Sequence, residues 1–154
     1  MTEPKPSAAP STHSLVLNGS LSELPRAMAW IEGQLEALDM PTRAAYGLTL
    51  SVDEALVNVM THGFGNPAGG QTPMEEGQGQ VQLRCEPREG HVMVQILDNG
   101  PAFDPTQHAP ADLADDMGEA RIGGHGVRLM MHFLSELSYE RQGEWNILTL
   151  VSGK

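Results

Sequence analysis

Three short segments of this 154-residue chain carry side chains that suit a nucleotide site. The first, residues 54–62, places Glu54, Asn58 and His62 four residues apart. On a helix this spacing puts the three side chains on one face. The amide oxygen of Asn58 suits Mg²⁺ as a hard, neutral ligand, and Glu54 can accept a proton from a hydroxyl or water beside a metal-bound γ-phosphate. The alternative is an amphipathic helix on which Glu54 and Asn58 face solvent.

The second segment, residues 98–105, reads Asp-Asn-Gly-Pro-Ala-Phe-Asp-Pro and directly follows an apolar run. An ionised Asp98 at the end of a strand can accept a hydrogen bond from an exocyclic amine, such as adenine N6. Gly100 lets the backbone turn where a side chain would obstruct it. The alternative is an ordinary Asp-Asn-Gly turn that only ends a strand.

The third segment, residues 123–127, is glycine-rich and is expected to open a helix. Glycines at such a position let phosphate oxygens approach backbone N–H groups at the helix N-terminus. The nearest cations are Arg121 and Arg128, and each can equally be a solvated surface charge. Because Lys5 and Lys154 lie at the extremities, a polyphosphate site must use a metal ion, backbone amides or arginine. The segment consists of Gly123, Gly124, His125, Gly126 and Val127.

The elements that must position these segments follow from hydrophobic spacing and turn residues. We expect strands at 13–18, 81–86, 91–97, 138–141 and 145–151 and helices at Ser22 to about Leu38, Pro41 to about His62 and Gly126 to about Leu137. Ser22 is the predicted N-cap of the first helix. The pattern predicts an α+β fold, a two-layer α/β sandwich whose mixed, mostly antiparallel sheet carries three helices on one face. Residues 1–13 are expected to be a disordered tail, and 14–154 one domain.

Composition narrows the class of protein. The net charge of −11 disfavours binding to a nucleic-acid backbone and suits recognition of other proteins. No apolar run reaches the roughly 18 residues of a membrane span. A single cysteine, Cys85, is expected to be a small buried hydrophobe in a strand, and it favours a reducing, cytoplasmic setting. The loop at 63–80 lacks the ending of a P-loop, and no histidine or cysteine pair has zinc spacing.

Taken together and in this order, the three segments resemble the N, G1 and G2 boxes of the GHKL ATPases (gyrase, Hsp90, histidine kinase, MutL). Glu-x-x-x-Asn-x-x-x-His-Gly at 54–63, Asp-x-Gly-x-x-Phe-Asp-Pro at 98–105 and the Gly-His-Gly box at 124–126 are most similar to the stand-alone anti-sigma factor/serine-protein kinase family. The resemblance covers about residues 14–151. Phe103, with the Asp-Pro that follows it, belongs to its most specific part.

The resemblance implies a role for each matching residue. It makes Glu54 the general base, Asn58 the Mg²⁺ ligand and Asp98 the acid that recognises adenine. It makes residues 105–122 the ATP lid. His62 is left open between a structural and a substrate-positioning role. The other nucleotide-binding residues that it implies are Gly100, Phe103, Arg121, Gly123, Gly124, His125, Gly126 and Val127.

The resemblance also implies an activity: ATP- and Mg²⁺-dependent phosphorylation of a STAS-domain antagonist on serine or threonine, by an anti-sigma-type regulator that acts through partner switching. A sigma factor and a homodimer are further possible partners. The sequence departs from the family pattern at two places: His125 lies between the G2 glycines, and the lid holds acidic residues without a lysine. They keep open a non-catalytic nucleotide-binding interaction module. A severed histidine-kinase domain is disfavoured, since residues 1–39 show no dimerisation helix with a phospho-accepting histidine.

Overall fold

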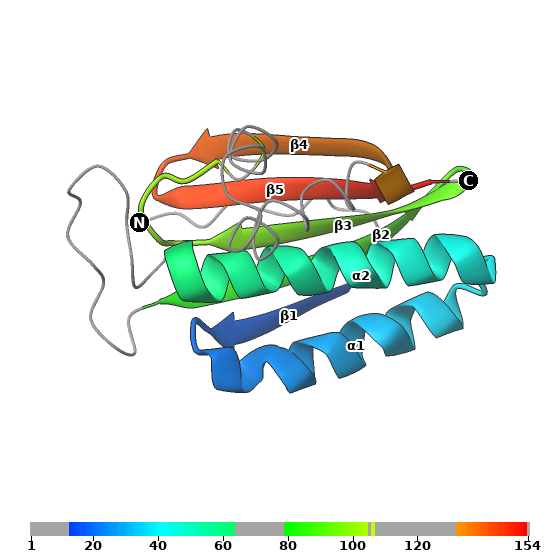
Figure 1. The fold of residues 1–154 in the computed structure, drawn as a ribbon, viewed down its shortest axis with the longest axis horizontal. Coiled ribbons are helices and arrows are strands. Elements are labelled where there is room, and N and C mark those ends of the chain that lie inside the picture. Colours follow the sequence, from blue (N-terminus) through cyan, green and yellow to red (C-terminus); the bar gives the residue numbers. More distant parts are fainter. Residues whose placement is uncertain (1–12, 64–78, 105, 107–131, 154) are drawn as a thin grey trace, which may run out of the picture.

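Five strands in the described part of the chain form one antiparallel sheet, and two helices pack against one of its faces (Figure 1). The computed structural model describes residues 13–63, 79–104, 106 and 132–153. The elements are β1 (His13–Asn18), the 3₁₀ turn η1 (Leu21–Glu23), α1 (Leu24–Ala37), α2 (Thr42–Asn58), β2 (Gln80–Arg88), β3 (His91–Asp98), β4 (Leu134–Gln142) and β5 (Trp145–Ser152). In space the strands lie in the order β1-β2-β3-β5-β4, and each neighbouring pair is antiparallel. The predicted α+β sandwich is confirmed.

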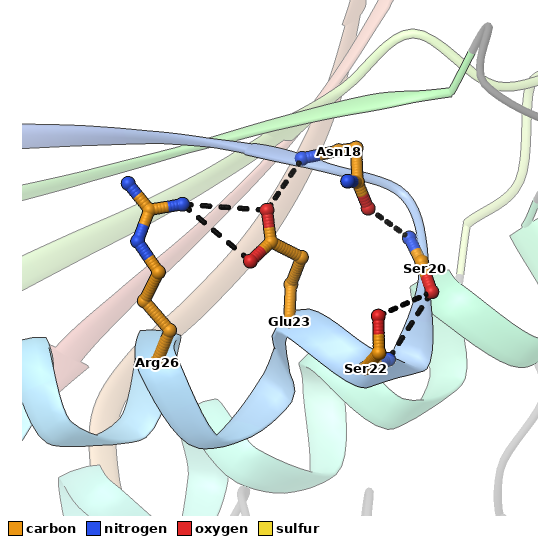
Figure 2. A network of polar contacts seen from close by, with 5 residues as sticks. All are labelled: Asn18, Ser20, Ser22, Glu23 and Arg26. Atoms are coloured by element: carbon orange, nitrogen blue, oxygen red, sulfur yellow. Dashed lines mark hydrogen bonds and ion pairs between the residues drawn. The ribbon is translucent and has the colours of Figure 1, made fainter.

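The entry into α1 is fixed by polar side chains, which Figure 2 shows. The prediction of Ser22 as the N-cap is wrong, because η1 precedes α1 and is itself capped by Ser20. The Ser20 hydroxyl accepts a hydrogen bond from the Ser22 backbone N–H at 3.2 Å. Glu23 accepts one from the Asn18 N–H at 3.3 Å and forms an ion pair with Arg26 at 3.3 Å. The Ser20 hydroxyl thus satisfies an N–H group that the start of η1 leaves without a partner.

The hydrophobic core lies between the two helices and the sheet. Apolar side chains of both helices are buried there, and Ile31 on α1 and Leu48, Val52 and Leu56 on α2 are completely inaccessible. Burying one such side chain stabilises the fold by roughly 1.5–3 kcal/mol. The helices therefore present one face to the sheet and the other to solvent. Among the described helices, none is long and apolar enough to cross a membrane.

After Asn58 the helix widens. The chain continues in a π-helical turn, Val59–Gly63, so the predicted helical extent to about His62 is confirmed but its last part is not α-helical. The Thr61 hydroxyl donates to the Val57 carbonyl at 2.7 Å, one of the side-chain bonds that compete with helix bonds. Single π turns inside or at the end of α-helices occur frequently at functional sites.

Both predicted hairpins are present. Gly90 (φ +74°) turns the chain between β2 and β3, and Gly143 (φ +62°) turns it between β4 and β5. Both positions lie in the left-handed region that glycine adopts without steric cost. Cys85 lies in β2 and is 1% exposed, and burial raises the pKa of its thiol to about 11. The thiol is therefore a core group, as the sequence predicts.

The prediction of a third helix reaching Leu137 is wrong at its C-terminal end. His132 and Phe133 are helical, but β4 begins at Leu134, while residues 126–131 lie outside the described residues. A β-bulge between Leu134 and Glu136 shifts the phase of the strand. As a result Leu134 and Leu137, three residues apart, both pack on the core. That spacing is typical of a helix, which explains the error.

The topology brings three distant parts of the chain to one end of the molecule. β3 ends at Asp98, β5 begins at Trp145, and the C-terminal end of α2 lies toward this same end (Figure 1). Asp98 and Asn146 are direct partners in the register of β3 and β5.

Candidate functional site

Asp98, the last residue of β3, is 5% exposed and uses its two carboxylate oxygens differently. Its Oδ1 accepts hydrogen bonds from the Gly100 backbone N–H at 3.0 Å and from the Asn146 side-chain amide at 2.9 Å. No hydrogen bond to its Oδ2 is seen among the described residues. One oxygen is thus committed to the fold, and the other can accept a hydrogen bond from a ligand.

Asn146 on β5 is the residue that holds the turn after β3, and it is not among the predicted site residues. It is 4% exposed. Besides Asp98, its Nδ2 donates to the Pro101 carbonyl at 2.9 Å and to the Gly100 carbonyl at 3.4 Å. Its Oδ1 accepts from the Phe103 backbone N–H at 3.3 Å. A signal was available, because Asn146 shares the inward phase of β5 with Leu148, and a buried amide needs partners.

β4 adds a second layer of contacts behind this turn. The Tyr139 hydroxyl donates to Asn146 Oδ1, and burial raises the pKa of the phenol, which therefore stays neutral as a donor. The Arg141 guanidinium donates to the Gly100 carbonyl at 2.8 Å. The turn is also tied to β2, since the Asn99 side chain accepts from the Gln80 N–H at 2.8 Å. The turn is therefore held by its neighbouring strands.

The electrostatics of Asp98 follow from this setting. Burial raises the pKa of its carboxyl to about 6, and the hydrogen bonds from Asn146 and Gly100 and the charge of Arg141 act in the opposite direction. Near pH 7 the group is mostly ionised and accepts hydrogen bonds. A carboxylate of this kind can read an exocyclic amine through Oδ2.

Glu54 on α2 has a buried carboxylate oxygen that lacks a partner. Its Oε2 has no hydrogen bond among the described residues, although the side chain as a whole is only half-buried. Burial raises the pKa of Glu54, and the neighbouring Asp53 charge adds to the effect. A carboxylate with a raised pKa is a stronger base than an exposed one. An orphaned oxygen of this kind fits a site that a substrate or hydrated cation completes.

Asn58, one turn after Glu54, is 7% exposed, and no hydrogen bond to its side chain is seen in the described residues. His62 follows in the π-helical turn. The described residues contain no group of three or more His, Cys, Asp or Glu side chains that could hold a metal ion alone. Mg²⁺ in nucleotide sites is bound by one or two protein oxygens together with phosphates and water. The side-chain oxygen of Asn58 fits that mode of binding.

The structure brings only part of the predicted site into view. Asp98, Gly100 and Phe103 form one connected turn, and Glu54 and Asn58 share the end of α2 that lies toward it (Figure 1). The remaining predicted ligands lie outside the described residues: Arg121, Gly123, Gly124, His125, Gly126 and Val127. The predicted lid lies outside them as well, apart from Thr106, whose N–H donates to the Asp104 carboxylate at 2.9 Å.

A cavity of about 530 Å³ occurs elsewhere, at the opposite end of the sheet. It is lined by the α1–α2 turn, by the β2–β3 turn and by Ser152 and Gly153 at the end of β5. None of the predicted site residues lines it. It is therefore separate from the candidate nucleotide site.

Comparison with known proteins places the chain in a family. The sequence model of the histidine kinase-like ATPase domain matches residues 17–152. The chain is 39% identical over 141 residues to the serine/threonine-protein kinase BtrW of Bordetella bronchiseptica. The matched region covers 92% of this chain and 93% of BtrW. The resemblance to GHKL ATPases inferred from the three segments is confirmed.

Two solved structures share the fold. The blue-light activated histidine kinase of Erythrobacter litoralis EL346 gives a TM-score of 0.51 at 23% identity, covering 84% of this chain and 41% of that one. The structure of the histidine kinase domain from the same protein gives a TM-score of 0.50 at 22% identity, covering 95% of this chain and 65% of that domain structure. This chain thus spans less than two thirds of either structure, and the likeness concerns the fold alone. With the family match and the BtrW similarity, it follows that the chain belongs to the histidine kinase-like ATPase domain family.

Proposed function

We propose that this chain is an ATP- and Mg²⁺-dependent serine/threonine protein kinase of the anti-sigma type. Its substrate would be a STAS-domain antagonist, and phosphorylation would release one partner for another. Membership of an ATPase domain family and the similarity to a protein named a serine/threonine-protein kinase support the reaction class. The observation that carries the proposal is the pairing of Asp98, with one oxygen open to a ligand, and Glu54, with one oxygen lacking a partner.

Asp98 supplies base recognition in this proposal. Its Oδ2 would accept a hydrogen bond from the exocyclic amine of adenine, while Gly100 and Asn146 keep the carboxylate in place through Oδ1. The hydrogen bonds of Asn146 to the turn arrange this acceptor before the nucleotide arrives. Little ordering is then required on binding, which favours affinity.

Glu54 supplies the proton transfer. It would take the proton of the substrate serine or threonine hydroxyl as the hydroxyl oxygen bonds to the γ-phosphorus, and ADP leaves with the electrons of the broken P–O bond. Burial, with the charge of Asp53, raises the pKa of Glu54, which makes its carboxylate a better proton acceptor. Asn58 would hold the Mg²⁺ together with the phosphates, and the bound ion would neutralise charge that builds up on them.

The proposed partners are proteins. A net charge of −11 repels a phosphate backbone, whereas it can steer binding to a protein with a basic face. The STAS-domain antagonist and a sigma factor are the partners that the anti-sigma hypothesis requires, and a homodimer is compatible with it. Proteins retained by the purified chain with and without Mg-ATP would identify them.

Transfer of the γ-phosphate tests the proposal directly. The chain is incubated with Mg²⁺, γ-labelled ATP and each STAS-domain protein of the source organism, and the labelled residue is located by mass spectrometry. We expect Glu54→Gln to slow transfer by roughly 10²–10⁴-fold, the usual contribution of a general base. The dissociation constant for ATP, measured by titration calorimetry, should stay nearly the same because Glu54 does not contact the base in this proposal.

Asp53→Asn is the matched control, because it removes the neighbouring carboxylate that adds to the pKa shift of Glu54. It should change the rate only slightly. Undiminished transfer in Glu54→Gln would remove Glu54 from the mechanism. Tight ATP binding without a labelled serine or threonine on any STAS-domain protein would favour the non-catalytic module.

A further inference from the structure

The side-chain amide of Asn146 has only one orientation that satisfies its neighbours. The Phe103 backbone N–H can only donate, so it must face the amide oxygen at 3.3 Å. The Pro101 carbonyl can only accept, so it must face the amide nitrogen at 2.9 Å. With this orientation fixed, the nitrogen also points at Asp98 Oδ1, and the Tyr139 hydroxyl meets the amide oxygen.

We infer that Asn146 is a positioning residue for base selection: it occupies one oxygen of Asp98, so that the other oxygen alone reads the substituent at position 6 of the purine. The inference rests on the proposed nucleotide site and extends it to base specificity. It goes beyond that site by assigning a role to a β5 residue and by predicting when specificity inverts.

The chemistry depends on whether the reading atom accepts or donates a hydrogen bond. When Asp98 is ionised, Oδ2 can only accept a hydrogen bond, and the 6-amino group of adenine can donate one. The 6-oxo group of hypoxanthine is itself only an acceptor, so it forms no hydrogen bond with the ionised Oδ2. Because Oδ1 already receives two N–H bonds, a proton added to Asp98 must reside on Oδ2. Oδ2 then becomes a donor and matches a 6-oxo purine. Acidification should therefore invert the base preference.

The charged groups around Asp98 set where this inversion occurs. Burial raises the pKa of Asp98 to about 6, while Asn146, Gly100 and Arg141 counteract the shift. Tyr139 faces the same turn from β4, and burial raises the pKa of its phenol. The Phe103 hydrogen bond and the charge of Arg141 counteract this shift, and the charges of Asp104 and Asp98 add to it. On α2, burial and then the charge of Asp53 raise the pKa of Glu54. Loss of the Asn146 donor should raise the pKa of Asp98 and move the inversion to higher pH.

The test compares Mg-ATP with Mg-inosine triphosphate, which differ at position 6 and the adjoining N1 proton. Dissociation constants are measured by titration calorimetry on the full chain between about pH 5.5 and about pH 7.5. The ratio of the two constants cancels the titration of the triphosphate, which both nucleotides share. We expect the preference for ATP to fall at least about tenfold over this range, as the fraction of ionised Asp98 falls.

Three variants separate positioning from general structure. Asp98→Asn keeps an acceptor for Gly100 and Asn146 and places an NH₂ where Oδ2 was, so it should prefer inosine triphosphate at every pH. Asn146→Ala should retain the preference for ATP at high pH but lose it at higher pH than the parent protein. Tyr139→Phe removes one partner of Asn146 and should shift the profile in the same direction by less. It keeps the test decisive if Asn146→Ala does not fold.

Gln95→Ala is the matched control. Gln95 on β3 also donates to a β5 side chain, Thr149 at 3.1 Å, but its phase along β3 places it on the other face of the sheet from Asp98. Its pH profile should match that of the parent protein. An unchanged profile in both Asn146→Ala and Tyr139→Phe, or a preference of Asp98→Asn for ATP, would overturn the inference while ATP binding itself stands. Failure of the parent protein to bind either nucleotide would overturn the proposed function as well.

Discussion

At the scale of single residues, the candidate site keeps two carboxylates in surroundings that disfavour their charge. Burial raises the pKa of both Asp98 and Glu54. A buried charge without full compensation lowers the stability of the folded state. Residues of this kind are frequent at functional sites, where an ordinary hydrophobic or exposed residue would be more stable. We therefore expect these two carboxylates to lower the stability of the fold while they contribute to ligand binding.

The conflict can be tested at Asp98. Its pKa rises from an ordinary value of 3.8 to about 6 in the folded state, so the folded chain binds the proton more tightly. The contribution of Asp98 to the free energy of unfolding is therefore highest below pH 3.8. It decreases by up to roughly 3 kcal/mol as the pH rises to about 6. Asp98→Asn should match the parent protein near pH 4 and exceed its free energy of unfolding above about pH 6. Urea unfolding across this range measures the difference.

Glu36→Gln, a change of an exposed α1 carboxylate, is the control for this prediction and should leave the pH dependence as it was. Curves of Asp98→Asn and the parent protein that run parallel from pH 4 to pH 7 would show that Asp98 does not carry a raised pKa. The same variant would lose ATP binding at neutral pH. Stability and binding thus change in opposite directions at one atom.

Local sequence patterns point to motif residues but not to the side chains that support them. Asp98 was selected because an acidic residue after an apolar strand is a local signal. Asn146 was not, because its partners lie in β3 and β4 and a single asparagine in a strand has no such signal. Only its inward phase beside Leu148 pointed to a buried amide. Tertiary hydrogen-bond networks of this kind become visible with coordinates.

At the scale of elements, the contact between α2 and the start of β4 depends on a glycine. A Cβ atom at Gly47 would lie 2.7 Å from the Cβ of Phe133, closer than real side-chain carbons approach. Phe133 also meets Tyr46 edge-on, with ring centroids 6.1 Å apart. The glycine thus lets the segment that leads into β4 lie directly on α2.

Gly47→Ala should therefore destabilise the protein by roughly 1–3 kcal/mol, although alanine favours a helix more than glycine does. Gly33→Ala on α1 is the matched control, because nothing lies within 4 Å of the added carbon. It should stabilise by up to about 1 kcal/mol. Thermal and urea unfolding of the two variants give the comparison. Equal stabilisation by both changes would show that Phe133 yields without cost.

Element boundaries were predictable where the hydrophobic period was regular. The stripes of α1 and α2 and the two glycine-turned hairpins follow from local spacing. The start of β4 was missed because its bulge gives Leu134 and Leu137 the spacing of a helix. The π-helical turn after Asn58 was missed because no local pattern distinguishes it from an α-helical one.

At the scale of the whole molecule, antiparallel pairing explains why Asp98 and Asn146, 48 residues apart, meet. β3 ends where β5 begins, and α2 runs back over the sheet to the same end (Figure 1). The order of the three motifs indicated the family without indicating this geometry. The convergence follows from the strand order β1-β2-β3-β5-β4, which sequence periodicity does not determine. The placement of the third motif remains a prediction.

Global opening of the fold can be followed through Cys85, the one cysteine of the sequence. Its thiol is buried in β2, and its pKa is raised to about 11, so a thiol reagent reacts only after the sheet opens. If Mg-ATP binds the folded state alone, a ligand concentration of 100 times the dissociation constant should slow labelling about 100-fold. The rate of reaction with an aromatic disulfide, with and without Mg-ATP, measures this. Labelling that Mg-ATP does not slow would indicate local exposure of β2.

The double use of Asn146 also limits how this protein can change over generations. An aspartate at this position would place a second negative charge beside Asp98, and a leucine of similar size would offer neither a donor nor an acceptor. The aspartate leaves the Pro101 carbonyl and Asp98 Oδ1 without their donor, and the leucine also leaves the Tyr139 hydroxyl and the Phe103 N–H without their acceptor. We therefore expect residues 139 and 146 to change together in related sequences, as paired substitutions in β4 and β5.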